Sequence, residues 1–80
     1  MRLPRDLSGD DLAKSLIRLG YQPTRQHRSH IRLTTQQHGT HHITIPRHDS
    51  LRVGTLAGIL RDVAAHFGIS REEVLKRLFD

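Results

Sequence analysis

Residues 29–46 read SHIRLTTQQHGTHHITIP, and this stretch decides the fold. Aliphatic residues alternate with polar ones in both of its halves, and a short segment around Gly39 separates the halves. The alternating aliphatic residues are Ile31, Leu33, Ile43 and Ile45. A period of two is typical of a β-strand with one buried face, and two such runs around a Gly-bearing turn are typical of a hairpin. We therefore predict two antiparallel strands, 29–35 and 41–46, joined by a turn at 36–40.

The phase of these strands determines which polar side chains share a face. If the aliphatic side chains face a core, then His30, Arg32 and His42 must lie together on the opposite face, which stays open to water. This face belongs to a basic part of the chain, because the sequence has no Asp or Glu from Leu12 to His48. The same span carries six Lys and Arg residues and six of the seven histidines. We expect such a surface to favour polyanions, of which a phosphate backbone is the commonest.

The hairpin is preceded by a helix and a weaker strand. Leucines at helical spacing predict a helix over residues 9–19, which Ser8 caps at its start and Gly20 ends. Residues 21–26 read as a third strand, and Pro23 restricts it to the edge of the sheet.

Two more helices follow the hairpin. An apolar stripe predicts a helix from Val53 or Gly54 to His66, with Gly68 just beyond its end. Ser70 is a good N-cap and opens a short C-terminal helix. The predicted fold class is α+β: an α-β-β-β-α order with a three-stranded antiparallel sheet, helices on one face and the extra short helix. We expect residues 1–80 to form a single domain.

Composition narrows the class of protein further. The chain has no cysteine, so disulfides and thiolate metal sites are excluded, and a reducing cytoplasm fits. We find no apolar run of membrane-spanning length and no signal-peptide pattern, and we therefore expect a cytoplasmic protein without a membrane partner. The net charge of +5 favours nucleic acid or an acidic protein as a partner and does not choose between them.

Several short stretches in this order resemble the HicA family of bacterial toxin-antitoxin toxins. The matching stretches are Leu19-Gly20-Tyr21, Arg25-Gln26, Ser29-His30, the IPRH of 45–48, residues 51–56 and Ile59-Leu60. The resemblance implies a fold like that of double-stranded RNA-binding domains. It also implies an mRNA-cleaving endoribonuclease that needs no metal or other cofactor and is neutralised by a HicB antitoxin. The family's catalytic histidine falls on His30. The family usually has Gly before the Ser-His pair, and we expect Arg28 at that position to remodel the turn and weaken the enzyme.

The residues themselves fit this chemistry. Cleavage of RNA by its own 2′-hydroxyl needs a general acid/base, and the unperturbed pKa of histidine, about 6.5, suits both roles. Arginine offers a bidentate fork to phosphate. We therefore predict His30 as the catalytic residue. The residues expected to contact RNA phosphate are Arg25, Arg28, Ser29, Arg32 and His48.

Other interpretations remain open from the sequence alone. On the same scaffold, a non-catalytic RNA-binding module or a small adaptor for an acidic protein would explain the basic surface. His38, His41 and His42 could form a metal cluster, but histidines at the tip of a hairpin are more often simply polar, and we predict no metal site.

Overall fold

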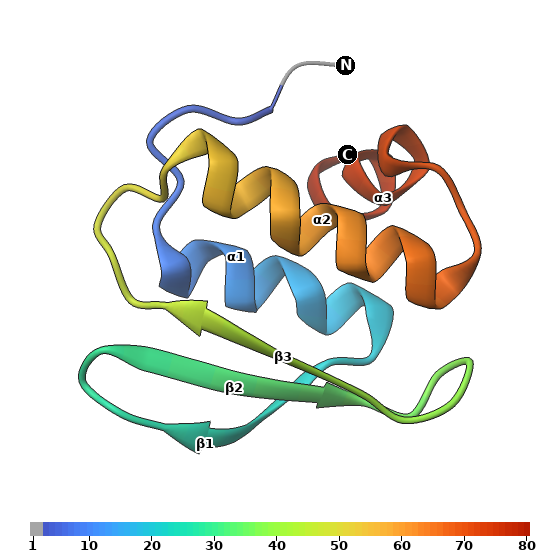
Figure 1. Ribbon diagram of the computed structural model, residues 1–80, viewed down its shortest axis with the longest axis horizontal. Coiled ribbons are helices and arrows are strands. Elements are labelled where there is room, and N and C mark those ends of the chain that lie inside the picture. The colour runs from blue at the N-terminus through green and yellow to red at the C-terminus, as the bar shows by residue number, and fades with distance from the viewer. Residues whose placement is uncertain (1–2) are drawn as a thin grey trace.

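The predicted hairpin is the centre of a three-stranded antiparallel sheet in the computed structural model, which describes residues 3–80. The strands are β1 (Gln22–Gln26), β2 (His30–Thr35) and β3 (His41–Pro46), in the spatial order β1-β2-β3 (Figure 1). Burial alternates along β2 and β3 as the sequence predicts, with Leu33 and Ile45 fully buried. The hairpin phase and the fold class are therefore confirmed.

The helices begin and end where local sequence signals place them. Helix α1 (Gly9–Leu16) starts from a complete Ser8 capping box and continues as a 3₁₀ turn, η1 (Ile17–Leu19). Gly20 ends this segment with φ = 83°, a conformation that favours glycine. The predicted helix over 9–19 thus has a tighter last turn than expected, in which the Gly20 N–H donates to the carbonyl of Ile17.

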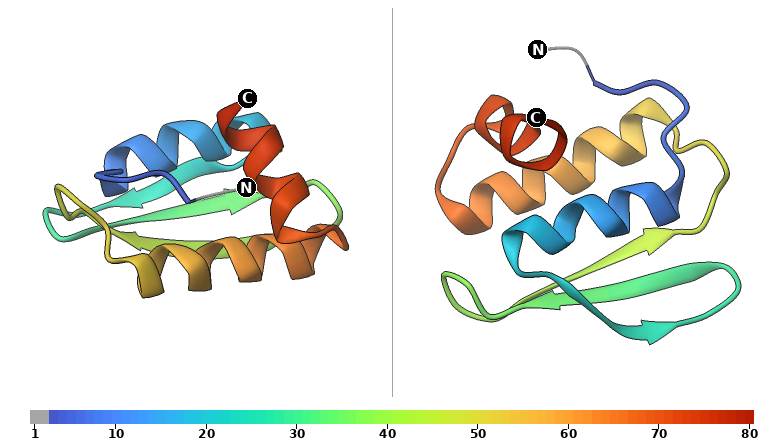
Figure 2. Two further views of the ribbon diagram at one scale, coloured as in Figure 1. Left: turned by 90° about the horizontal axis from the view of Figure 1, so that it is seen from above. Right: turned by 180° about the vertical axis from the view of Figure 1, so that it is seen from behind.

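Helix α2 (Val53–Phe67) is one residue longer than predicted, and Gly68 terminates it with φ = 65°. Helix α3 (Arg71–Phe79) starts at the expected Ser70 cap. Helices α1 and α2 lie over the same face of the sheet, and α3 lies across both of them (Figure 2). Buried aliphatic residues from all of these helices and from β2 and β3 form one core cluster, and no element within residues 3–80 covers the other face of the sheet.

The start of α1 lies directly against the end of β3. The Gly9 N–H donates to the His48 carbonyl at 3.0 Å. A Cβ atom at position 9 would lie 2.1 Å from the Pro46 carbonyl oxygen, so only glycine permits this approach. This contact ties the loop after β3 to the start of α1, and the same loop reaches the β1–β2 turn through the Arg47 N–H, which donates to the Ser29 carbonyl.

Candidate functional site

His30 occupies the first position of β2 and is half-buried. Its neighbour Ile31 is buried under the helices, so the His30 side chain belongs to the open face, as the strand phase predicts. Its Nδ1 lies 2.9 Å from the Ser29 hydroxyl oxygen, and its ring centroid lies 4.7 Å from that of His27. With Nδ1 engaged, Nε2 is the nitrogen that remains for a ligand.

Arg47 fixes the turn that carries His30. Its backbone N–H donates to the Ser29 carbonyl at 2.8 Å, and its Nη1 donates to the His27 carbonyl at 3.0 Å. Its Nε lies 3.2 Å from a carboxylate oxygen of Asp10 in α1. Arg47 therefore joins the β1–β2 turn, the end of β3 and the first turn of α1. The sequence interpretation assigned no role to this residue, because its partners lie far away along the chain.

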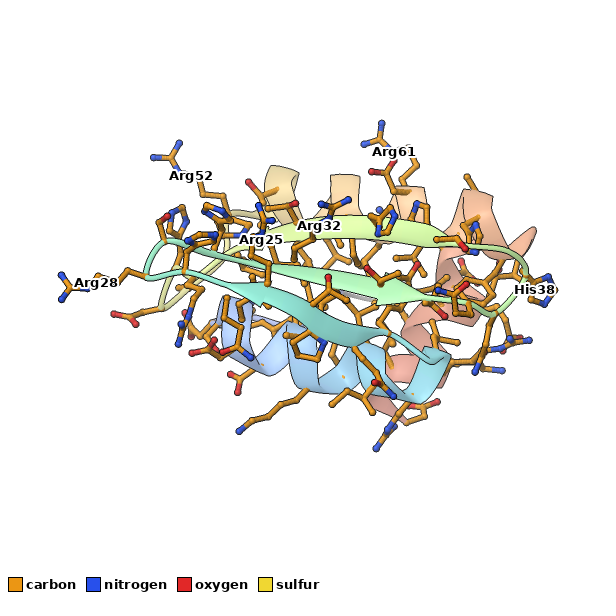
Figure 3. All side chains as sticks on the ribbon, turned by 90° about the horizontal axis from the view of Figure 1, so that it is seen from below. Arg25, Arg28, Arg32, His38, Arg52 and Arg61 are labelled. Carbon is orange, nitrogen blue, oxygen red and sulfur yellow. The ribbon has the colours of Figure 1, made fainter. Side chains whose placement is uncertain are left out.

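Arg25 and Arg32 are direct cross-strand neighbours on β1 and β2. The register shifts between Pro23 and Arg25, and this irregularity brings Arg25 onto the open face beside Arg32 (Figure 3). None of the ion pairs found within residues 3–80 involves either arginine. Like charges directly opposite each other are destabilising in a sheet. The pair therefore creates a site at which an anion would relieve repulsion.

Arg28 and His48 lie further out. Arg28 is exposed at the tip of the β1–β2 turn and points away from the end of the sheet (Figure 3). Its backbone is not among the left-handed positions of residues 3–80, so the turn does not demand glycine there. His48 is exposed in the loop after β3, and no hydrogen bond or ring contact within the described part of the chain joins it to His30.

Of the predicted site residues, the structure thus groups four around one end of the open face: Arg25, Ser29, His30 and Arg32. His27 is an addition that sequence reasoning missed. The sequence places His27 three residues before His30, on the other side of a turn, but the contact between the two rings depends on the geometry of that turn.

A second imidazole pair lies at the other end of the sheet. The rings of His41 and His66 stack with centroids 4.5 Å apart and planes at 12°. The Tyr21 hydroxyl lies 2.7 Å from Nδ1 of His41, and Nε2 of His66 donates to the Gln37 carbonyl at 2.8 Å. Burial, and then the charge of Asp62, raise the pKa of Tyr21 to about 12, so this phenol keeps its proton and donates it.

The same surroundings oppose a charge on His41. Burial, followed by the neighbouring His66, lowers the pKa of His41, and only Asp62 acts in the opposite direction.

Across residues 3–80, no three or more His, Asp and Glu side chains are arranged to hold a metal ion. In the same part of the chain, no helix combines the length and apolar character needed to cross a bilayer.

A family model described as the HicA toxin of bacterial toxin-antitoxin systems matches residues 9–64, which is well over half of the chain. The chain belongs to the HicA toxin family. Membership makes it the toxin of a toxin-antitoxin pair, with an antitoxin as its partner. No curated protein and no solved structure gives a significant match. The HicA match includes all three strands, the β1–β2 turn and Asp10, so it covers the whole group of residues around His30.

Proposed function

We propose that this HicA toxin is a metal-independent endoribonuclease that cleaves mRNA with His30 as general acid/base, and that a HicB-like antitoxin neutralises it. One observation carries the proposal. An imidazole with a free Nε2 stands on the open sheet face, next to a hydroxyl and beside two arginines without ion-pair partners in residues 3–80.

The reaction follows from these groups. Nε2 of His30 takes the proton of a ribose 2′-hydroxyl, and the 2′ oxygen bonds to the adjacent phosphorus. The bond from phosphorus to the 5′ oxygen of the next nucleotide breaks, and His30 returns its proton to that oxygen. The products are a 2′,3′-cyclic phosphate and a 5′-hydroxyl, so no water or cofactor is consumed.

The surrounding residues stabilise charge and orientation. Arg25 and Arg32 face the same side of the sheet and would hold the phosphate oxygens as negative charge accumulates on them. The Ser29 hydroxyl holds the His30 ring through Nδ1. Arg28 and His48, at the turn tip and in the loop after β3, would contact phosphates of flanking nucleotides.

Incubation of a defined mRNA with purified protein in excess EDTA tests the proposal. We expect the wild type to cleave and His30→Ala to lose at least about a hundredfold in rate. His38→Asn is a matched control, because it removes an exposed imidazole at the opposite end of the sheet and Asn tolerates the φ of 57° found there. This control should cleave like the wild type and leave 2′,3′-cyclic phosphate ends.

Three outcomes would contradict the proposal. Cleavage that EDTA abolishes would point to a metal, and equal cleavage by His30→Ala would remove the catalytic role of His30. A wild type that binds RNA without cleaving it would be a non-catalytic RNA-binding module on the same scaffold.

A further inference from the structure

The open face of the sheet continues past the two arginines into a neutral trough. This hollow has a volume of about 570 Å³. Its lining consists only of amide and hydroxyl side chains and one glycine: Gly20, Gln22, Thr24, Thr34, Gln36 and Gln37. Within residues 3–80 its lining includes no apolar side chain, so it is not an unfinished core, and no charged side chain, so it is not a second phosphate site.

Hydrogen bonds hold the floor of the trough in one arrangement. The hydroxyls of Thr24 and Thr34 lie 3.1 Å apart, and the Thr34 hydroxyl lies 2.8 Å from Nδ1 of His42. The Thr24 hydroxyl also donates to the Arg32 carbonyl at 3.4 Å. Because of this network, the floor is set before any ligand arrives, and this limits the entropy lost on binding.

The walls present amide groups. Gln22 and Gln36 are exposed, and the Gln36 amide oxygen accepts a hydrogen bond from the Thr40 hydroxyl at 2.7 Å, which leaves its NH₂ group as the donor for a ligand. At the end of the trough, the Gln37 side chain lies over Gly20, where a Cβ atom would be 2.6 Å from the Gln37 Nε2. Glycine at position 20 thus makes room for this amide.

Position along β2 relates the trough to the catalytic end. His30, Arg32 and Thr34 follow one another on the same face, with a spacing of about 6.6 Å per two residues. A proton-transfer group, a phosphate-binding cation and a neutral donor/acceptor site therefore stand in a row. An amide offers both a donor and an acceptor, which is the pattern on the edges of nucleobases, and a hydroxyl matches the ribose 2′-hydroxyl.

We propose that this trough binds the base and ribose of a nucleotide beside the scissile phosphate and sets the base preference of cleavage. This inference rests on the proposed function. The ligand class is single-stranded RNA, because base pairing in a duplex already occupies the edges that the glutamines would read. Gln22 and Gln36 are the specificity-determining residues.

Mapping of all cleavage positions on one long unstructured RNA tests the inference. We expect the double variant Gln22→Ala/Gln36→Ala to keep cleaving, but with relative rates at individual positions changed by about tenfold. Gln26→Ala is the matched control, because it removes an exposed amide from the same strand at a position paired with the buried Ile31, away from the open face. Its cleavage pattern should equal that of the wild type.

A second measurement separates this inference from the proposed function. His30→Ala protein is titrated with short labelled single-stranded RNAs that differ at one base, with and without the trough substitutions. If the trough substitutions abolish a base preference in binding, the inference that the trough reads the base is supported even when the wild type does not cleave RNA. If the wild type cleaves RNA and the double variant has the same cleavage pattern and the same binding preferences as the wild type, the inference is overturned but the proposed nuclease function is supported. It is also overturned if single-stranded RNA does not bind, or if the double variant loses affinity only for the antitoxin.

Discussion

The two ends of the sheet each carry a pair of imidazoles, and the pairs differ in what their nitrogens can do. His41 and His66 stack face to face, and one nitrogen of each is committed to Tyr21 or to the Gln37 carbonyl. The ring planes of His27 and His30 are inclined to each other by 35° at the end of the sheet next to the β1–β2 turn, where the Ser29 hydroxyl contacts Nδ1 of His30. Catalysis requires a ring edge that a substrate can reach, and within residues 3–80 only the His27–His30 pair offers one beside arginines that lack ion-pair partners.

The comparison shows that the surroundings of a histidine matter more than its presence. Around His41, the rings of Tyr21 and His66 fill the space next to the imidazole, and burial disfavours its charge. Around His30, the neighbours are a flexible hydroxyl, another imidazole and a turn tied down through Arg47. We interpret the His41–His66 pair as part of the packing between α2 and the β2–β3 turn, and the His27–His30 pair as the one that contains the proposed catalytic residue.

Outside the residues proposed to contact RNA, the largest expected effect comes from releasing the end of the sheet that carries His30. Arg47→Met removes the side-chain bonds to the His27 carbonyl and to Asp10, so only the backbone bond from position 47 to the Ser29 carbonyl still holds the turn that carries His30. We expect a loss of about a hundredfold in kcat for RNA cleavage with little change in overall folding, measured by single-turnover cleavage and circular dichroism.

Arg77→Met is the matched control for this substitution. It breaks the other ion pair of residues 3–80, between Arg77 and Glu73 in α3, far from the sheet. Its cleavage rate should stay at the wild-type level. Equal rate losses in the two variants would show that Arg47 has no special role in positioning His30.

His27 should have the next largest effect, through the ring that it places against His30. With centroids 4.7 Å apart, the two rings are too close to flank a phosphate in line, so we expect His27 to position His30 rather than transfer a proton. His27→Ala should lower kcat about tenfold, whereas His27→Phe, which keeps a ring, should restore most of it. Loss of cleavage in both variants, with a changed pH–rate profile, would instead make His27 a proton donor.

These two predictions also show where sequence reasoning succeeds and where it stops. The strand phase, the Ser8 and Ser70 caps and the stop at Gly20 follow from residues a few positions apart, and all were predictable. The bond between Arg47 and Asp10 joins residues 37 positions apart, and no local sequence pattern predicts it.

The position of Arg25 illustrates the same limit. Regular alternation along β1 from the open-face residue Gln22 would turn Arg25 toward the helices. The register shift after Pro23 moves it to the open face, opposite Arg32. A single irregular residue in a strand reverses every side chain beyond it, and a short polar edge strand carries no hydrophobic pattern from which to detect this.

The pH dependence of stability should distinguish the packed imidazole pair. The pKa of His41 is lowered in the folded state, chiefly by burial and then by His66, so the folded protein binds fewer protons than the unfolded chain. This part of the stability is fully present above the ordinary pKa of 6.5 and is lost as the pH falls through the lower folded-state value. Urea denaturation at a series of pH values measures it.

His41→Asn provides the comparison for that series. The variant lacks the titrating ring, so its free energy of unfolding should fall less steeply with decreasing pH below 6.5 than that of the wild type. Identical slopes would mean that protonation of His41 is not coupled to folding, and the contrast between the two pairs would rest on geometry alone.

The smallest expected effect is at Arg28, where the charge and the backbone make separate contributions. If Arg28 contacts one phosphate, Arg28→Ala should weaken RNA binding a few-fold and reduce the slope of log affinity against log salt by about 0.7. Arg71→Ala, at the start of α3, should leave that slope unchanged.

Arg28→Gly then isolates the backbone. Because the turn does not use a left-handed conformation at this position, glycine brings no relief of strain, and its extra freedom costs up to about 1 kcal/mol of stability. We therefore expect Arg28→Gly to behave like Arg28→Ala in cleavage and binding. A rate above the wild type in Arg28→Gly alone would show that the arginine holds the turn, and with it His30, away from its most active geometry.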